Sequence, residues 1–156
     1  MNVKSTLIEA HIFRKVEGHL EYLLMQRAKD EIYPNIWQMV TGSVEQNEKA
    51  FQTAYREIQE ETSLIPRRMW VVPNVNSFYL QSDDSINMVP VFVAEVDSDS
   101  QIVLSSEHTE YKWCKKEDAK KLLAWAGQRN SVDIISEYFS ETNSLLNLIE
   151  INKGEI

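Results

Sequence analysis

The chain has 156 residues, the usual size of one domain, and 43% of them are hydrophobic, which is enough for a packed core and excludes an intrinsically disordered protein. Its 24 acidic and 16 basic residues give a formal net charge of −8, which argues against duplex nucleic acid or an anionic membrane as the main partner but leaves room for a small phosphorylated ligand. A single cysteine, Cys114, and no apolar run of signal-peptide or membrane-spanning length lead us to expect a cytoplasmic protein without an internal disulfide.

The part of the chain before residue 42 has the pattern of β-strands. Apolar and β-branched side chains gather in three runs: residues 6–16, 20–27 and 36–40. Glu17-Gly18-His19 has the composition of a turn, so the first two runs are predicted to form a hairpin. The charged segment between the second and third runs contains Pro34 and is predicted to be a loop.

The strongest helix prediction begins after Asn47 and reaches about Thr62. Asn47 is a favourable N-cap, and Glu48 then places negative charge in the first turn, where the helix dipole favours it. Pro66 disfavours helical backbone in the residue before it, so the helix is expected to end before this position.

The two faces of this helix differ in chemistry. At about 100° per residue, Glu57, Glu60 and Glu61 share one face, and the apolar side chains of the helix form a separate stripe that can bury against a sheet. Two carboxylates about 6 Å apart repel by roughly 2 to 3 kcal/mol at an effective dielectric constant of about 20. A divalent cation reverses the sign of that interaction, and Mg²⁺ prefers oxygen ligands. For a bare Glu-x-x-Glu-Glu, the alternative is a solvated acidic face.

The rest of the chain returns to strands and ends in helices. Strand patterns occupy residues 70–80, 88–96, 102–104 and 111–114, with polar turns at 81–87 and 97–101. Pro73 predicts that the first of these strands lies at an edge or is interrupted. Helical stretches are expected at 117–126 and 131–150, the second weak around Thr142-Asn143. The pattern favours a single domain over residues 1–156 with an α/β fold, in which a mixed sheet is covered on both faces.

The segment from Gly42 to Leu64 resembles the Nudix box, G-x5-E-x7-R-E-U-x-E-E-x-G-U, where U is a large apolar residue. Eight of the nine fixed positions agree. The exception is Ser63, where the family usually has a glycine that closes the helix with positive φ, a geometry that serine adopts at a cost of about 1 kcal/mol. The resemblance implies a Nudix-type α/β/α sandwich with a catalytic loop-helix-loop, and a hydrolase that cleaves phosphoanhydride bonds.

In the Nudix family the box binds Mg²⁺ or Mn²⁺. The metal ligands that the resemblance implies are three carboxylates and a carbonyl, those of Glu57, Glu60, Glu61 and Gly42. Glu57 would also orient or deprotonate the attacking water. Arg56 would hold a carboxylate in place through charge-assisted hydrogen bonds, and Glu48 would support the metal shell.

Many members of the family add one more acid from outside the box. Glu107 is the candidate here and Glu110 the second, because a Glu-His-x-x-Tyr-x-Trp segment similar to residues 107–113 occurs in the dihydroneopterin triphosphate and dinucleoside tetraphosphate branches. The alternative for Glu107 is a solvated acid before a strand. His108 is expected to be a structural or loop residue rather than a proton carrier.

Residues 37–45 and the later Trp125, Arg129 and Asn130 look similar to bacterial dihydroneopterin triphosphate pyrophosphatases, which act on the route to folate. Trp37 is a candidate for stacking on the substrate's heterocycle, with burial in the core as the alternative. Further candidate substrate contacts are cationic, each with a solvated or helix-capping role as its alternative: Arg27, Lys29 and Arg129.

The expected substrate is a small nucleoside or pterin triphosphate, and the protein is expected to be a monomer or a homodimer. Two other functions stay open. The substrate could instead be a dinucleoside polyphosphate (Ap4A-type) or an ordinary or damaged (d)NTP. The chain could also be a non-catalytic Nudix module that binds a nucleotide, although such modules usually have a degraded box and this chain has every acid.

Overall fold

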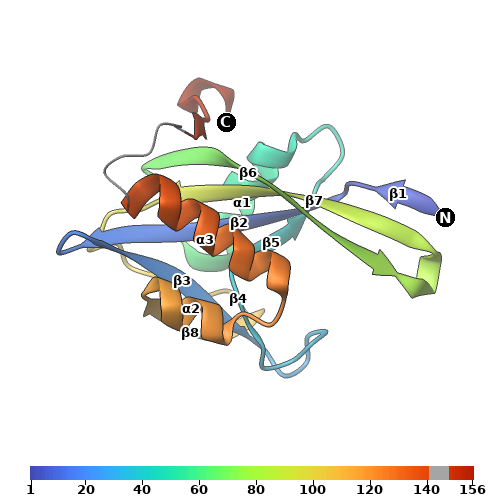
Figure 1. Ribbon diagram of the computed structural model, residues 1–156, viewed down its shortest axis with the longest axis horizontal. Helices are drawn as coiled ribbons and strands as arrows, with labels where there is room; N and C mark the ends of the chain where they lie inside the picture. The colour runs from blue at the N-terminus through green and yellow to red at the C-terminus, as the bar shows by residue number, and fades with distance from the viewer. Residues whose placement is uncertain (141–147) are drawn as a thin grey trace.

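The computed structural model describes residues 1–140 and 148–156, which form a mixed sheet with helices on both faces (Figure 1). Its strands are β1 (Asn2–Lys4), β2 (Leu7–Val16), β3 (His19–Arg27), β4 (Trp37–Gln38), β5 (Val40–Ser43), β6 (Arg68–Leu80), β7 (Ser85–Glu95), β8 (His108–Cys114) and β9 (Ile149–Glu150). Its α-helices are α1 (Ala50–Thr62), α2 (Lys116–Leu122) and α3 (Ala126–Ser140). Short 3₁₀ turns occupy Gln81–Asp83 and Lys153–Glu155.

The sheet is built around β2, which pairs antiparallel with β3 and parallel with β7. The main path runs β4-β3-β2-β7-β6-β9, while β5 pairs with another part of β2, β8 with β3 and β1 with β7. Parallel and antiparallel pairs therefore occur in one sheet, which confirms the predicted mixed architecture.

Alternation along β2 separates two cores, one on each face of the sheet. Ile8, Ala10 and Ile12 pack in a cluster with Ala54 and Ile58 of α1. Phe13 belongs to the cluster on the other face, which includes Val132 and Ile135 of α3. Figure 1 shows α3 across the near face of the sheet and α1 behind it. Full burial of each large side chain contributes roughly 1.5 to 3 kcal/mol, so the apolar stripe of α1 fixes which side of the helix meets the sheet.

Helix α1 begins later than predicted. Asn47 has φ +66 and lies in the preceding loop, and the N-cap is Lys49, so the predicted Asn47 cap with Glu48 in the first turn is wrong. The reason is that Glu48 is occupied elsewhere: it accepts hydrogen bonds from the side chains of Thr53 and Arg56. The backbone N–H of Lys49 instead donates to Gln52 Oε1 at 3.0 Å.

The end of α1 confirms the geometry expected at the departure from the Nudix pattern. Ser63 is left-handed, with φ 60 and ψ 12, and its backbone N–H donates to the carbonyl of Gln59 at 2.8 Å. A serine therefore closes the helix in the conformation that usually favours glycine.

Other boundaries differ where pairing overrides local pattern. The predicted strand 36–40 is split at the buried Met39, because β4 pairs with β3 and β5 pairs with β2. Strand β6 runs through Pro73, but its register shifts between Val72 and Val75, which confirms an interruption there.

The last third of the chain departs furthest from the predicted elements. Residues 102–104 are not a strand, and β1 was not predicted. Helix α3 begins at Ala126 rather than Ser131, and Ile149–Glu150 is a strand rather than the end of a helix. The predicted weak point at Thr142-Asn143 lies outside the described residues. No described helix has the length and apolar character needed to span a bilayer.

Candidate active site

Arg56 organises the carboxylates at the exposed side of α1. Its Nε donates to Glu48 Oε1 at 2.9 Å, and its Nη1 donates to Glu57 Oε1 at 2.9 Å and to Glu60 Oε2 at 3.2 Å. The hydrogen bond from Arg56 lowers the pKa of Glu48 to about 2, although partial burial of the carboxyl opposes it. Glu48 is therefore an ionised anchor for Arg56, and Arg56 fixes one oxygen of Glu57.

Gly42 lies directly against Glu57. A Cβ atom added to Gly42 would stand 2.3 Å from Glu57 Cγ, closer than any real contact, so only glycine leaves room for this carboxylate. Burial raises the pKa of Glu57, and the hydrogen bond and charge of Arg56 oppose that rise. The structure thus brings Gly42, Arg56 and Glu57 together, as the family resemblance implied.

Glu61 is the most deeply buried acid of the box. Its side chain lies at the C-terminal end of α1, the residue is 3% exposed, and Oε2 has no hydrogen-bond partner among the described residues. Burial, followed by the charges of Glu107 and Glu57, raises the pKa of Glu61 to about 9, and Arg27 opposes this only in part. Arg27 therefore does not offset the cost of ionising Glu61 at this buried position.

The segment after residue 102 carries Glu107 to this site. Its backbone is tied to the end of α1, with Val103 N donating to the Thr62 carbonyl at 3.0 Å and Ser105 N to the Glu61 carbonyl at 3.1 Å. The carbonyl of Glu107 also accepts from Ala28 N at 2.9 Å. Glu110 pairs with Gln26 in the sheet and is not part of the acidic group.

Glu61, Glu107 and His108 form a cluster of potential metal ligands. Each offers a ligand atom, and these atoms lie within 4.8 Å of one another. Two ionised carboxylates at that separation would repel by roughly 3.5 kcal/mol at an effective dielectric constant of about 20, and by less where solvent screens Glu107. Burial, with the charge of Arg27 second, lowers the pKa of His108 to about 4, so the ring is neutral near pH 7. An uncompensated acidic group with an orphaned carboxylate oxygen fits a divalent cation.

Glu60 stands apart from this cluster. Its side chain is 58% exposed and is directed at Arg56, and Glu57 also gives one oxygen to Arg56. That Glu57, Glu60 and the Gly42 carbonyl are metal ligands stays a prediction.

The tryptophans Trp37 and Trp125 differ in their surroundings. Trp37 packs at the edge of the second core cluster beneath Lys112, whose Nζ is 4.6 Å from the ring centroid, which favours the packing alternative. Trp125 is 43% exposed and meets Tyr33 edge-to-face at 5.4 Å. Sequence reasoning did not select this pair, because nothing local indicates that residues so far apart in the chain meet. Tyr33 belongs to the loop that follows β3, and the first part of this loop is tied to the Glu107 backbone through Ala28.

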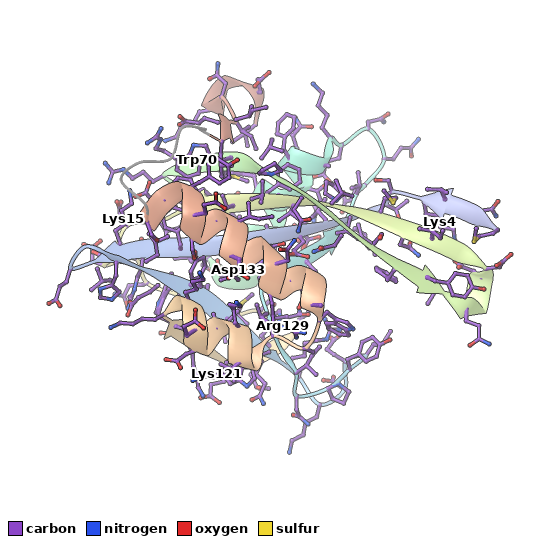
Figure 2. The ribbon with its side chains drawn as sticks, in the orientation of Figure 1. Lys4, Lys15, Trp70, Lys121, Arg129 and Asp133 are labelled. Atoms are coloured by element: carbon purple, nitrogen blue, oxygen red, sulfur yellow. The ribbon has the colours of Figure 1, made fainter. Side chains whose placement is uncertain are left out.

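The three predicted cationic contacts have different surroundings. Arg27 Nε donates to the Ile32 carbonyl at 2.7 Å and holds the loop that follows β3. Lys29 is exposed in that loop. Arg129 donates to the Leu123 and Ala124 carbonyls at 2.8 Å each, which favours the helix-capping alternative (Figure 2).

Comparison with known proteins places this geometry in a family. Residues 9–133 match the family model described as the NUDIX domain. The chain is 28% identical over 116 residues to the bis(5'-nucleosyl)-tetraphosphatase [asymmetrical] of Caenorhabditis elegans, covering 74% of this chain and 82% of that protein. It is 28% identical over 123 residues to the dihydroneopterin triphosphate diphosphatase of Escherichia coli (strain K12), covering 71% and 79%.

A solved structure shows the same arrangement of the chain. The binary complex of a C. elegans Ap4A hydrolase superposes with a TM-score of 0.71 and 25% identity, covering 85% of this chain and 96% of the other.

Proposed function

The chain belongs to the Nudix family of hydrolases, and we propose from that membership that it cleaves a phosphoanhydride bond of a small nucleoside-triphosphate-like compound with the help of Mg²⁺ or Mn²⁺. The observation that carries the proposal is the meeting of Glu61 and Glu107, from distant parts of the chain, beside Glu57. Among the residues that the structure describes, Arg56 is paired with Glu57, and Arg27 offsets the charge of Glu61 only in part. A polyphosphate bound with a divalent cation complements it.

The site residues have two different roles: two of them would bind the divalent cation, and a third accepts a proton. Glu61 and Glu107 would hold the divalent cation, which when bound supplies positive charge to the phosphate oxygens and makes water more acidic. Glu57 Oε1 accepts a hydrogen bond from Arg56, which leaves Oε2 to accept a proton from the attacking water. The water oxygen forms the new bond to phosphorus, and the bond to the bridging oxygen breaks as the leaving phosphate, pyrophosphate or nucleotide departs.

The raised pKa of Glu57 suits this role. A carboxylate whose pKa is raised by burial is a better proton acceptor than an exposed one, and Arg56 keeps it oriented. No covalent intermediate on the protein is needed.

Two substrates have support. Dihydroneopterin triphosphate, which would place the enzyme in folate biosynthesis, is supported by the relative from E. coli and by residues 37–45 of this chain. A dinucleoside tetraphosphate is supported equally by the relative and the structure from C. elegans. Both carry a flat heterocycle next to a polyphosphate, and the exposed pair of Tyr33 and Trp125 offers aromatic surface to either.

A substrate panel separates these possibilities. Purified protein with Mg²⁺ is assayed on dihydroneopterin triphosphate, diadenosine tetraphosphate and dATP, with detection of phosphate, pyrophosphate and nucleotide products. We expect kcat/KM on one of the first two to exceed that on dATP by on the order of 10-fold or more. No hydrolysis of any member with Mg²⁺ or Mn²⁺, despite binding, would instead identify a nucleotide-binding module.

A further inference from the structure

His108 is buried beside the acidic cluster with one ring nitrogen unused. It opens β8 and is 5% exposed, and its Nδ1 is buried with no hydrogen-bond partner in residues 1–140 and 148–156. The other ring nitrogen, Nε2, lies 3.0 Å from the side-chain amide of Gln38, itself 4% exposed in β4. A buried polar atom left without a partner costs about 1 to 3 kcal/mol, so this arrangement calls for a ligand.

A second buried atom without a partner among the described residues belongs to the same cluster. This atom is Glu61 Oε2, and one ligand atom from each of Glu61, Glu107 and His108 lies within 4.8 Å of the other two. One cation bound among the three side chains would satisfy both orphaned atoms at once.

We propose that His108 Nδ1 is a direct ligand of the divalent cation that Glu61 and Glu107 hold, and that this nitrogen makes the site prefer Mn²⁺ and Co²⁺ to Mg²⁺. The proposal rests on the proposed function, since it concerns the same metal site. Mg²⁺ is a hard cation that favours oxygen, whereas imidazole nitrogen favours transition metals.

Gln38 is the positioning residue for this ligand. Metal binding at Nδ1 places the ring proton on Nε2, which then needs an acceptor. A half-turn of the Gln38 amide exchanges its nitrogen and oxygen and turns Oε1 toward Nε2. Gln38 would thus fix both the tautomer and the direction of the imidazole.

Pulsed electron paramagnetic resonance of bound Mn²⁺ tests the proposal directly. We expect ¹⁴N modulation from a coordinated imidazole in the wild type and its loss in His108→Ala. His19→Gln, a change at a histidine on the far end of β3, is the matched control and should keep the modulation.

Calorimetric titration of each protein with Mn²⁺ and Mg²⁺ gives the second readout. His108→Ala should weaken Mn²⁺ binding by on the order of 10-fold or more and Mg²⁺ binding much less. Gln38→Leu should weaken Mn²⁺ binding while the ¹⁴N modulation persists. Circular dichroism checks that the variants are folded.

Two results would overturn the proposal. If the wild type hydrolyses its substrate and binds Mn²⁺ without ¹⁴N modulation, or if His108→Ala binds Mn²⁺ as tightly as the wild type, the ligand assignment fails and the hydrolase assignment stands. If the wild type neither binds a divalent cation nor hydrolyses any substrate, both fail.

Discussion

At the scale of single residues, the position of the Glu57 carboxylate depends on residue 42 having no side chain. Gly42→Ala would force Glu57 away, because the new Cβ would stand 2.3 Å from Glu57 Cγ. A misplacement of about 1 Å can lower turnover by on the order of 10²-fold, so we expect kcat to fall by about that factor while the protein stays folded. Steady-state kinetics measure kcat, and circular dichroism checks that the variant is folded.

Gly154→Ala is the control for this change. The nearest atom to its added Cβ is 3.8 Å away, so turnover should stay at the wild-type level. Equal rates for the two variants would show that Glu57 does not need its present position.

A second single-residue prediction concerns Trp125, the proposed contact for the substrate's heterocycle. Loss of one stacking partner costs roughly 1 to 3 kcal/mol, so Trp125→Ala should raise KM by on the order of 10-fold and change kcat little. Tyr79→Ala removes another exposed aromatic side chain, 55% exposed on the distant β6–β7 hairpin, and should leave KM unchanged. If both substitutions change KM equally, the substrate's heterocycle does not stack on Trp125.

At the scale of elements, the left-handed end of α1 is a strained position that the sequence tolerates. Ser63→Gly should raise the free energy of unfolding by about 0.5 to 1 kcal/mol, because glycine adopts φ 60 without a steric cost. The gain is reduced by loss of the hydrogen bond from Ser63 Oγ to the Val103 carbonyl. Urea denaturation measures the difference.

Ser98→Gly is the matched change, because Ser98 also lies in a polar connection but is not among the residues with positive φ. Glycine there adds only freedom to the unfolded chain and should destabilise. Stabilisation by both changes would contradict the conformational explanation.

The elements also show what local sequence can and cannot determine. The end of α1 and the separation of its acidic and apolar faces were predictable, since both depend on side chains within a few residues. The start was not, because Glu48 forms hydrogen bonds with Thr53 and Arg56 instead of serving the first turn of the helix. The split of residues 36–40 into β4 and β5 depends on which strands lie opposite, and that information lies elsewhere in the chain.

At the scale of the whole molecule, a buried polar network joins the centre of the sheet to α3. His11 Nε2 and Glu9 Oε1 lie 2.6 Å apart, and Asn76 Nδ2 donates to Glu9 Oε2 at 2.5 Å. Asn74 links this group to Ser131 of α3 at 3.0 Å. Burial alone raises the pKa of Glu9, but the hydrogen bond and charge of His11, with hydrogen bonds from Asn76 and Ser131, outweigh it and hold the pKa below 4.5.

This network predicts how stability depends on pH. Because the folded pKa of Glu9 is depressed, its contribution is fully present above the unfolded value near 4.5 and is lost as the pH falls through the lower folded value. Glu9→Gln should therefore cost about 1 to 3 kcal/mol near neutral pH, and the gap to the wild type should narrow in acid. Urea denaturation over a pH series tests this, and a gap that stays constant to about pH 3 would mean that Glu9 is not ionised in the fold.

The site as a whole could be predicted only in part. The acids of α1 are close in sequence, so Glu57, Glu60 and Glu61 were found from spacing and family resemblance. Glu107 was a candidate by resemblance, but its place beside Glu61 depends on backbone hydrogen bonds between residues 103–105 and the end of α1. The unused nitrogen of His108 and the meeting of Tyr33 with Trp125 are consequences of tertiary packing, which sequence spacing does not contain.

The most direct test of the central claim is turnover measured with and without a divalent cation in the wild type and in Glu61→Gln. We expect hydrolysis that needs Mg²⁺ or Mn²⁺, stops with a chelator, and falls by on the order of 10²-fold or more in Glu61→Gln, while Glu110→Gln, which changes an acid outside the cluster, stays near the wild type. Undiminished hydrolysis in the presence of the chelator, or a Glu61→Gln variant as fast as the wild type, would contradict the account.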